Sequence, residues 1–558
     1  MFPTEITAFS QAFNSIHLYT YIGVSVLNGV LLFFASLKFI LVLQQSGYKS
    51  KRYFKWLGSR ETPYLSRLML LSLLGFLFFC VLSMNFTPAV GKTAASYVGF
   101  VSYLLFTLLY INTEKSVNAK VPLKKTARIA RLSIVYILSL AIVTFGLMVG
   151  LDYVAYLIGS EIVGILRYSV ICGMPLLTPY ILFLVHLVVY PMEKMISRYY
   201  VLRATRRLDH SQVLKIAITG SYGKTSVKEI LKTILSQKYR VLATPSSYNT
   251  PMGIALTTSQ LDSTHDVFIA EMGARSKGDI KTLTNIVKPT YGVLTGINSQ
   301  HLETFGSIEN IKDTKFELFE ELTKNGKAFF SVDSQGAKEL YERFVGTKFS
   351  SGTQDEESDV YATDIVTDER GTTFTLNIKG EQPVNCTTVL LGHHAVSNIC
   401  LASAVAYQIG MTPEEIANGI NRIQSVMHRL ELRPNNKDIV IIDDSYNSNE
   451  DGIKAAMEVL STFKGRKIVL TPGLVELGKM ENLLNLEFGK TLAKYADLVF
   501  VIGKHNAEML VSGLIEGGMP RENITFAKNL NKANEELNKI LKEGDVVLFE
   551  NDLPDNYS

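Results

Sequence analysis

The residues best suited to chemistry lie in one stretch, Lys215–Glu229, which reads KIAITGSYGKTSVKE. Its apolar run Ile216–Ile218 predicts a buried parallel strand, and the helical spacing of the later apolar positions predicts a helix beginning at Lys224. Glycines let backbone N–H groups approach phosphate oxygens, and a helix N-terminus favours an anion. Lys224 would neutralise the phosphates and the Thr225 hydroxyl would ligate Mg²⁺, so the stretch predicts a nucleotide site.

The turn of this motif consists of Gly220, Ser221, Tyr222 and Gly223. The gap between its two glycines is shorter than in the full G-x-x-x-x-G-K-[ST] pattern. A glycine-containing strand–helix turn with a solvated lysine is therefore the alternative interpretation of this stretch by itself.

Two further residues could serve a bound metal ion. Glu271 ends the predicted strand Asp266–Glu271, and a carboxylate at the end of a parallel strand beside a phosphate loop is where a Mg²⁺ ligand would lie. The alternative is a solvated strand-end carboxylate. His301 follows the predicted strand Tyr291–Thr295 and could be a metal ligand or a polar loop residue.

Lys315 lies in the predicted helix Glu309–Leu322, on the same face as the apolar Ile311 and Leu318. Its stem could pack on that face while its amine reaches out to solvent. Its amine could instead point inward at the nucleotide site. The pattern leaves both interpretations open.

Composition limits the choice of function. The chain has 558 residues, enough for several domains, with a net charge of +4 and only 19% charged residues. So small a net charge gives no support for a nucleic-acid partner. The four cysteines show no C-x-x-C spacing, so neither a disulfide framework nor a structural zinc site is predicted.

The mean hydropathy of +0.16 reflects an apolar N-terminal third. Five stretches there are long enough to cross a bilayer as a helix, which takes roughly 20 residues. A buried soluble helix is the alternative for any one of them, but five in succession favour a membrane domain. The stretches are Tyr19–Leu43, Leu68–Met84, Ala94–Ile111, Leu132–Gly150 and Ser169–Tyr190.

Lysine and arginine gather after the first, third and fifth stretches. The positive-inside rule then predicts a multi-pass protein of the cytoplasmic membrane, with the N-terminus outside and everything after Tyr190 in the cytoplasm. The stretches carry no acidic residue near their centres, which argues against a transporter. The loop Tyr48–Trp56 mixes basic and aromatic residues and is expected at the lipid headgroups.

Longer motifs follow the phosphate loop in a fixed order. They read TPSSYNTPMGIALT, EMGARSKGDI, NSQHLETFGSIENIKDTKFEL, IDDSYNSNEDG and GLVELG. With GSYGKTS they resemble the Mur ligases of peptidoglycan synthesis, above all those that add D-alanyl-D-alanine, over about Lys215–Asp545. The resemblance implies an enzyme that uses ATP to join a carboxylate to an amine through an acyl phosphate.

The resemblance also implies roles for single residues. Lys224 and Thr225 would hold the phosphates and Mg²⁺, and Glu271 and His301 would ligate Mg²⁺. Lys315 matches a lysine that is carbamylated in this family, which would place a carboxylate near a second Mg²⁺. Such a carbamate would explain why a lysine points inward from an apolar face.

Three other positions match nucleotide contacts of the family. They are Asn398 in GHHAVSNICLASA, Arg429 in MHRLEL and Asp444 in IDDSYNSN. The departures there are small, since Ala395 stands where the family usually has Asn and Glu450 where it usually has Pro. The larger departures are at the two ends, where apolar stretches replace the UDP-sugar-binding domain and the usual Lys-Gly-Ser turn is missing.

The sequence therefore predicts three domains. Residues 1–210 would form an α-helical membrane domain, 211–425 a central α/β ATP-binding domain, and 426–558 a C-terminal Rossmann-like α/β domain. We expect an ATP- and Mg²⁺-dependent ligase of cell-envelope synthesis that acts on a precursor carrying a carboxylate and on an amino acid or short peptide. The alternatives are a poly-γ-glutamate-type or capsule-modifying amide ligase, and a membrane binding protein with an inactive ligase domain.

Overall fold

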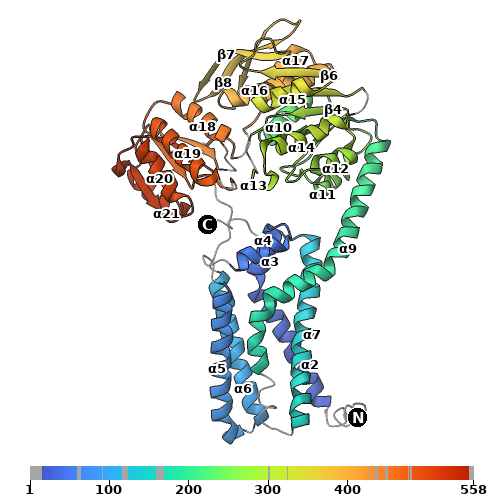
Figure 1. Cartoon of the computed structure of the whole chain (residues 1–558), viewed down its shortest axis with the longest axis vertical. Coiled ribbons are helices and arrows are strands. Elements are labelled where there is room, and N and C mark those ends of the chain that lie inside the picture. The colour runs from blue at the N-terminus through green and yellow to red at the C-terminus, as the bar shows by residue number, and fades with distance from the viewer. Residues whose placement is uncertain are drawn as a thin grey trace. The chain divides into compact units, whose positions relative to one another are not determined.

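The structure is a computed structural model and divides into two compact units, Met1–Ile196 and Ser197–Ser558 (Figure 1). Helix α9 (Met174–His210) runs across the boundary. The residues that the structure describes are 15–58, 64–90, 92–115, 123–158, 169–298, 302–322, 325–425, 428–433, 438–445, 450–475, 477 and 480–551.

The first unit is mostly helical in its described residues, and helices cover all five predicted apolar stretches. Three helices are long and apolar enough to cross a membrane by length and composition, over Leu18–Ala35, Ala127–Ile158 and Ile171–His210. Two shorter apolar runs lie at Arg67–Phe78 and Tyr103–Asn112. The helices are α2 (Ser15–Ala35), α3 (Leu37–Gln45), α4 (Ser50–Leu57), α5 (Tyr64–Val90), α6 (Lys92–Lys115), α7 (Ala127–Ile158), η1 (Ser169–Gly173) and α9 (Met174–His210).

The composition of the first apolar stretch predicted one continuous helix, but the structure divides the stretch into α2 and α3. It breaks between α2 and α3 at Ser36, whose hydroxyl donates back to the Leu32 carbonyl at 2.7 Å. Tyr136 of α7 donates to the same hydroxyl at 3.0 Å. A serine that bonds its own helix in this way bends it, and the tyrosine holds the bend in place.

The surface of this unit is apolar and part of its interior is polar. Leu109, Ile142 and Val188 are more than 60% exposed. Inside, Asn28 donates to Thr144 at 3.2 Å and accepts from Tyr103 at 3.1 Å. Exposing large apolar side chains to water is unfavourable.

The second unit begins with a nine-stranded sheet in the order β2-β3-β1-β4-β5-β6-β7-β8-β9. Its strands are parallel from β2 to β7, while β8 and β9 extend the sheet antiparallel. The strands are β1 (Leu214–Thr219), β2 (Val241–Ala243), β3 (Val267–Glu271), β4 (Tyr291–Leu294), β5 (Lys327–Ser331), β6 (Thr347–Gly352), β7 (Val360–Asp368), β8 (Gly371–Ile378) and β9 (Val384–Thr388).

Helices cover both faces of this sheet, and two separate cores form beneath them. One core joins α10, α16 and α17 to the sheet through residues such as Ile230 and Ile399, and the other joins α11, α12 and α14 through residues such as Ile280 and Leu318. The helices are α10 (Lys224–Leu235), α11 (Pro251–Thr258), α12 (Asp279–Val287), α13 (Leu302–Phe305), α14 (Ile308–Glu320), α15 (Gln335–Arg343), α16 (His393–Ile409) and α17 (Pro413–Ile420).

A second sheet of six strands follows, in the order β10-β11-β15-β12-β13-β14. Only β10 is antiparallel to its neighbour, so the predicted α/β character of this region is confirmed. The elements are β10 (Glu431–Arg433), β11 (Val440–Asp444), α18 (Glu450–Thr462), β12 (Lys467–Thr471), α19 (Glu481–Tyr495), β13 (Leu498–Ile502), α20 (Ala507–Glu516), η3 (Arg521–Asn523), β14 (Ile524–Ala527), α21 (Leu530–Ile540) and β15 (Val546–Glu550).

The order of the first sheet determines where a ligand can bind. From β1 the chain runs outward to β2, returns to β3 beside β1, and then crosses to β4 on the other side of β1. Ligands of parallel α/β sheets bind at the carboxyl ends of the strands where the order reverses in this way. The predicted phosphate loop leaves β1 at that point.

Candidate active site

The phosphate loop connects β1 to α10 through two glycines with positive φ. Gly220 has φ +153°, and a Cβ there would lie 2.1 Å from Thr295 Oγ1. Gly223 has φ +74° in the left-handed region and precedes the first residue of α10. Both positions therefore require glycine, and the loop can place its backbone N–H groups at the start of the helix.

Lys224 is the first residue of α10 and its amine turns back over the loop. Its Nζ donates to the Gly220 carbonyl at 2.6 Å and to the Ser221 carbonyl at 2.9 Å. The pKa of Lys224 is lowered to about 8, chiefly by burial and also by Arg429, while Glu271 opposes the shift. The amine thus lies where the phosphates of a nucleotide would need a positive charge.

Glu271 ends β3 and is buried, so it is not the solvated strand-end carboxylate of the alternative interpretation. Its Oε2 accepts from the Thr225 hydroxyl at 2.9 Å and from Lys228 Nζ at 3.2 Å. Its Oε1 accepts from Asn249 Nδ2 at 3.1 Å. The carboxylate is therefore held by donors from α10 and from the loop before α11.

Sequence reasoning missed Lys228 and Asn249. Lys228 is fully buried on α10 and also donates to the Ser246 carbonyl. The sequence did carry a signal for Lys228, because this residue follows Lys224 by one helical turn and so lies on the same face of the helix. For Asn249 the sequence offered only a polar loop.

The oxygen donors here fit Mg²⁺. Thr225 gives its hydrogen to Glu271 and keeps its lone pairs, and Mg²⁺ prefers such hard oxygen ligands. Among the described residues, no group of three or more His, Cys, Asp or Glu side chains could hold a metal by itself. That suits an ion with one or two protein ligands that completes its shell with phosphate oxygens and water.

Lys315 lies in α14 and is 3% exposed, so it does not reach out to solvent. Its Nζ lies 6.0 Å from the centre of the Phe305 ring, and its amine has no hydrogen bond or ion pair within the described part of the chain. Burial and Lys224 lower the pKa of Lys315 to about 7, although Asp279 and Glu317 act to raise it. Much of this amine is therefore neutral at physiological pH.

A cavity of about 260 Å³ lies next to the loop. Gly223 and Asn398 line it from the first α/β region, and Arg429 and Asp444 line it from the second. Asn398 Oδ1 lies 2.9 Å from where a Cβ of Gly223 would be. Burial and Asp443 raise the pKa of Asp444, while Arg429 lowers it. Three predicted nucleotide contacts thus share one cavity with the loop.

His394, which the sequence reasoning did not single out, also lines this cavity. Its Nδ1 is buried and meets no partner among the described residues. Burial lowers its pKa to about 4, with contributions from His393 and Arg429, so the ring is neutral at pH 7. A neutral ring with an unmatched nitrogen could pair with a polar group of a bound ligand.

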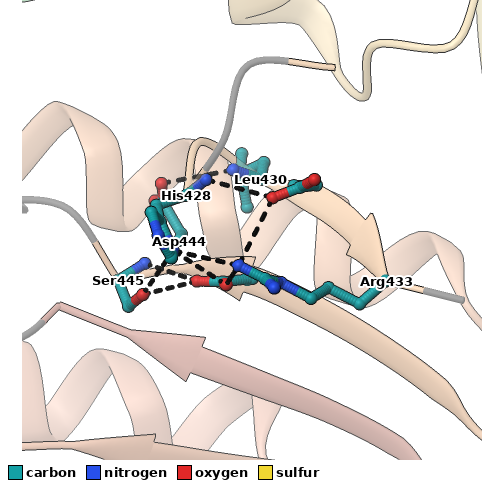
Figure 2. A network of polar contacts seen from close by, with 7 residues as sticks. His428, Leu430, Arg433, Asp444 and Ser445 are labelled. Atoms are coloured by element: carbon teal, nitrogen blue, oxygen red, sulfur yellow. Dashed lines mark hydrogen bonds and ion pairs between the residues drawn. The ribbon is translucent and has the colours of Figure 1, made fainter. Parts of the chain in front are cut away.

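Polar contacts hold His428 and Leu430 in place (Figure 2), and these residues flank Arg429 in the sequence. His428 Nδ1 lies 2.9 Å from Asp443 Oδ2, and Leu430 N donates to Asp444 Oδ1 at 3.3 Å. Arg433 pairs with Asp443 at 2.5 Å. His428 and Leu430 have φ of +60° and +44°, values that side chains disfavour. The network therefore fixes a strained segment beside the cavity.

Two parts of the predicted site are not described. His301 and residues 446–449 lie outside the described residues. The structure brings together Lys224, Thr225 and Glu271, and it places Asn398, Arg429 and Asp444 around the cavity.

Comparison with known proteins gives consistent matches. Residues 218–406 match the Mur ligase middle domain, and residues 428–550 match the Mur ligase glutamate ligase domain. The UDP-N-acetylmuramoyl-tripeptide–D-alanyl-D-alanine ligase of Buchnera aphidicola subsp. Baizongia pistaciae is 31% identical over 305 residues, which is 54% of this chain and 66% of that protein. The Bacillus subtilis protein of the same name is 30% identical over 338 residues, 60% of this chain and 72% of its own length.

A crystal structure of the MurF ligase of Thermotoga maritima in complex with ADP matches with a TM-score of 0.57 and 25% identity. The match covers 64% of this chain and 80% of that one. The chain spans about two thirds of the length of the curated relatives described above.

The parallel sheet, the phosphate loop and the second α/β region define an α/β protein of the architecture that places ligands at the carboxyl ends of its strands. The domain matches and the Bacillus relative identify it further, and the chain belongs to the Mur ligase family. The resemblance suggested by the motifs is confirmed, including its direction toward the D-alanyl-D-alanine-adding members.

Replacing Lys228 by Met should destabilise the second unit by about 3–5 kcal/mol, because it leaves the buried Glu271 carboxylate without its cation. The shift of the urea midpoint of the purified full-length protein measures this. Lys232→Met on the same helix is the matched control, since that lysine is 48% exposed and should contribute no more than about 1 kcal/mol. Equal shifts for both variants would show that the buried pair has no special role.

Proposed function

We propose that this protein is an ATP-dependent ligase that joins a carboxylate to an amine. The observation that carries the proposal is the phosphate loop with Lys224, Thr225 and Glu271 opening beside a cavity lined from both α/β regions. Relatives named as D-alanyl-D-alanine ligases and a related ligase crystallised with ADP support it.

The proposed reaction has two steps, and both involve anionic phosphate groups. The substrate carboxylate attacks the γ-phosphorus of ATP, ADP leaves, and an acyl phosphate forms. The amine then attacks the acyl carbon, phosphate leaves, and the nitrogen loses a proton. Lys224 and the loop N–H groups hold the anionic phosphates, and a bound Mg²⁺ would supply further positive charge there.

Water must be excluded, because hydrolysis of an acyl phosphate competes with amide formation. Asn398 on one side of the cavity and Arg429 and Asp444 on the other could hold a nucleotide between the two α/β regions. A ligand that contacts both regions favours the arrangement in which they enclose it. The cavity therefore suits a reaction with a water-sensitive intermediate.

We infer that the carboxylate substrate is a cell-envelope precursor and the amine an amino acid or short peptide. The names of the relatives support a peptidoglycan precursor and a D-alanyl-D-alanine-type amine. The apolar helices before the ligase domains favour a lipid-linked or membrane-proximal substrate, so capsule modification and poly-γ-glutamate-type synthesis stay as alternatives.

We also infer that the first unit spans the cytoplasmic membrane five times, with the N-terminus outside and the ligase domains in the cytoplasm. The apolar exterior of the helices and the loop distribution of Lys and Arg support this. A binding protein with an inactive ligase domain is the less favoured alternative, since it would need neither Lys224 over the phosphate loop nor Thr225 bonded to Glu271.

Replacing Lys224 by Ala should lower ATP turnover by roughly 100- to 1000-fold, because the variant loses the charge that faces the phosphates. Phosphate release by the purified full-length protein is the measurement. Lys232→Ala, on the exposed side of the same helix, should keep full turnover. Turnover near the normal rate in Lys224→Ala would mean that the loop is not the nucleotide site.

Replacing Lys315 by Ala should remove most activity, and short carboxylic acids should partly restore it by occupying the place of a carbamate. Lys315→Arg should not respond, because its guanidinium keeps the charge and fills the space. Carbamylation joins the neutral amine to CO₂ and releases a proton. Its yield, followed by NMR with labelled bicarbonate, should rise as the pH rises through about 7, the pKa of Lys315.

Two outcomes would contradict this role of Lys315. Full activity of Lys315→Ala would leave the lysine as a buried residue of the fold alone. A loss of activity without any rescue, together with no labelled carbamate signal, would make the residue necessary in another way.

A reporter enzyme fused after Arg207 should be active only in the cytoplasm, because the positive loops all lie on that side. A fusion after Val90, at the end of α5, is the matched control and should report the opposite side. The proposed topology is wrong if both fusions report the same compartment or if the pattern is reversed.

A further inference from the structure

Helix α4 of the helical unit has a buried face and a cationic face. Tyr53 and Leu57 are buried against the core of the unit. Lys51, Arg52 and Lys55 on the remaining surface are exposed. A short helix with this division covers apolar neighbours on one side and presents positive charge on the other.

Contacts with α9 hold α4 in place. The Tyr53 hydroxyl donates to the Pro179 carbonyl at 3.1 Å. The Phe54 ring lies 4.7 Å from the Phe183 ring, and the Tyr53 ring stacks on Phe183 at 6.1 Å. These contacts fix the orientation of α4, and with it the side of the helix on which the cations are exposed.

Among the described residues, no acidic side chain pairs with the cations of α4. Residues 15–58 contain no Asp or Glu. Nearby, Glu193 is already engaged by Arg131 through two bonds, at 2.6 and 2.9 Å, and the Arg128 guanidinium lies 3.5 Å from the centre of the Tyr48 ring. Within the described residues, Lys51, Arg52 and Lys55 pair with no acidic side chain.

Aromatic side chains lie at the border of the two faces. Phe54 is 38% exposed and Tyr180 of α9 is 43% exposed, with ring centres 6.4 Å apart. Trp56 is half-buried and packs against Phe39 at 6.2 Å. Aromatic rings beside lysine and arginine are the pattern of the boundary between lipid headgroups and acyl chains.

We propose that α4 docks on the anionic phospholipid headgroups of the cytoplasmic leaflet. Unpaired cations match lipid phosphates in charge, and the exposed rings match the acyl boundary beneath them. The proposal rests on the membrane insertion inferred above, but it is independent of the ligase chemistry. Its consequence is that this helix is held at the membrane surface.

Trp56 is the only tryptophan of the chain, so its fluorescence reports on α4 alone. The full-length protein is reconstituted in bilayers whose lipids carry bromine near the ester groups or near the chain ends. We expect stronger quenching by the shallow bromines. Quenching mainly by the deep bromines, or by neither kind, would overturn docking at the surface.

The anionic preference is tested by native mass spectrometry of lipids retained from mixed anionic and zwitterionic bilayers. Changing Lys51, Arg52 and Lys55 together to Gln should lower the anionic preference by about tenfold or more, and salt should weaken it in the unchanged protein. The control changes the exposed Lys464, Lys532 and Lys539 to Gln. An equal effect in both triple variants, or none in the first, would refute the proposal.

Two further measurements on the same samples separate this proposal from the proposed function. Retention of the protein in bilayers after an alkaline wash reports membrane insertion, and binding of a fluorescent ATP analogue reports the ligase site. Insertion and nucleotide binding with no lipid preference would reject the docking of α4 alone. A failure of nucleotide binding with normal quenching would reject the ligase proposal alone.

Discussion

The buried carboxylate of Glu271 is the group on which the geometry of the site depends. A carboxylate taken out of water is costly unless donors compensate its charge. Thr225, Lys228 and Asn249 supply those donors at 2.9, 3.2 and 3.1 Å. Because they come from α10 and from the loop before α11, the bonds that compensate the charge also fix the phosphate loop relative to β3.

The rest of the site follows from the strand order. Parallel strands carry their loops to one edge, and the reversal of order at β1 leaves room there for a ligand. Gly220 and Gly223 then let the backbone pass where any side chain would collide. The second α/β region adds Arg429 and Asp444, which the contacts around His428 and Asp443 hold beside the same cavity.

The helical unit and the ligase domains differ in how they accommodate polar groups. In the ligase domains a buried charge is compensated by protein donors, whereas in the helical unit polar groups such as Asn28 pair inside and apolar side chains face outward. In the part of the chain that the structure describes, the cations of α4 pair with no acidic side chain. Helix α9 belongs to both units.

The sequence by itself determined the phosphate loop, the alternation of strands and helices, the apolar helices and the family, because these depend on spacing along the chain. It placed Lys315 on an apolar face but could not say whether its amine pointed in or out. Only the tertiary structure decided that the amine is buried, that the first apolar stretch breaks at Ser36, and that Lys228 and Asn249 hold Glu271. Those outcomes depend on neighbours distant in sequence, and burial and pairing are properties of such neighbours.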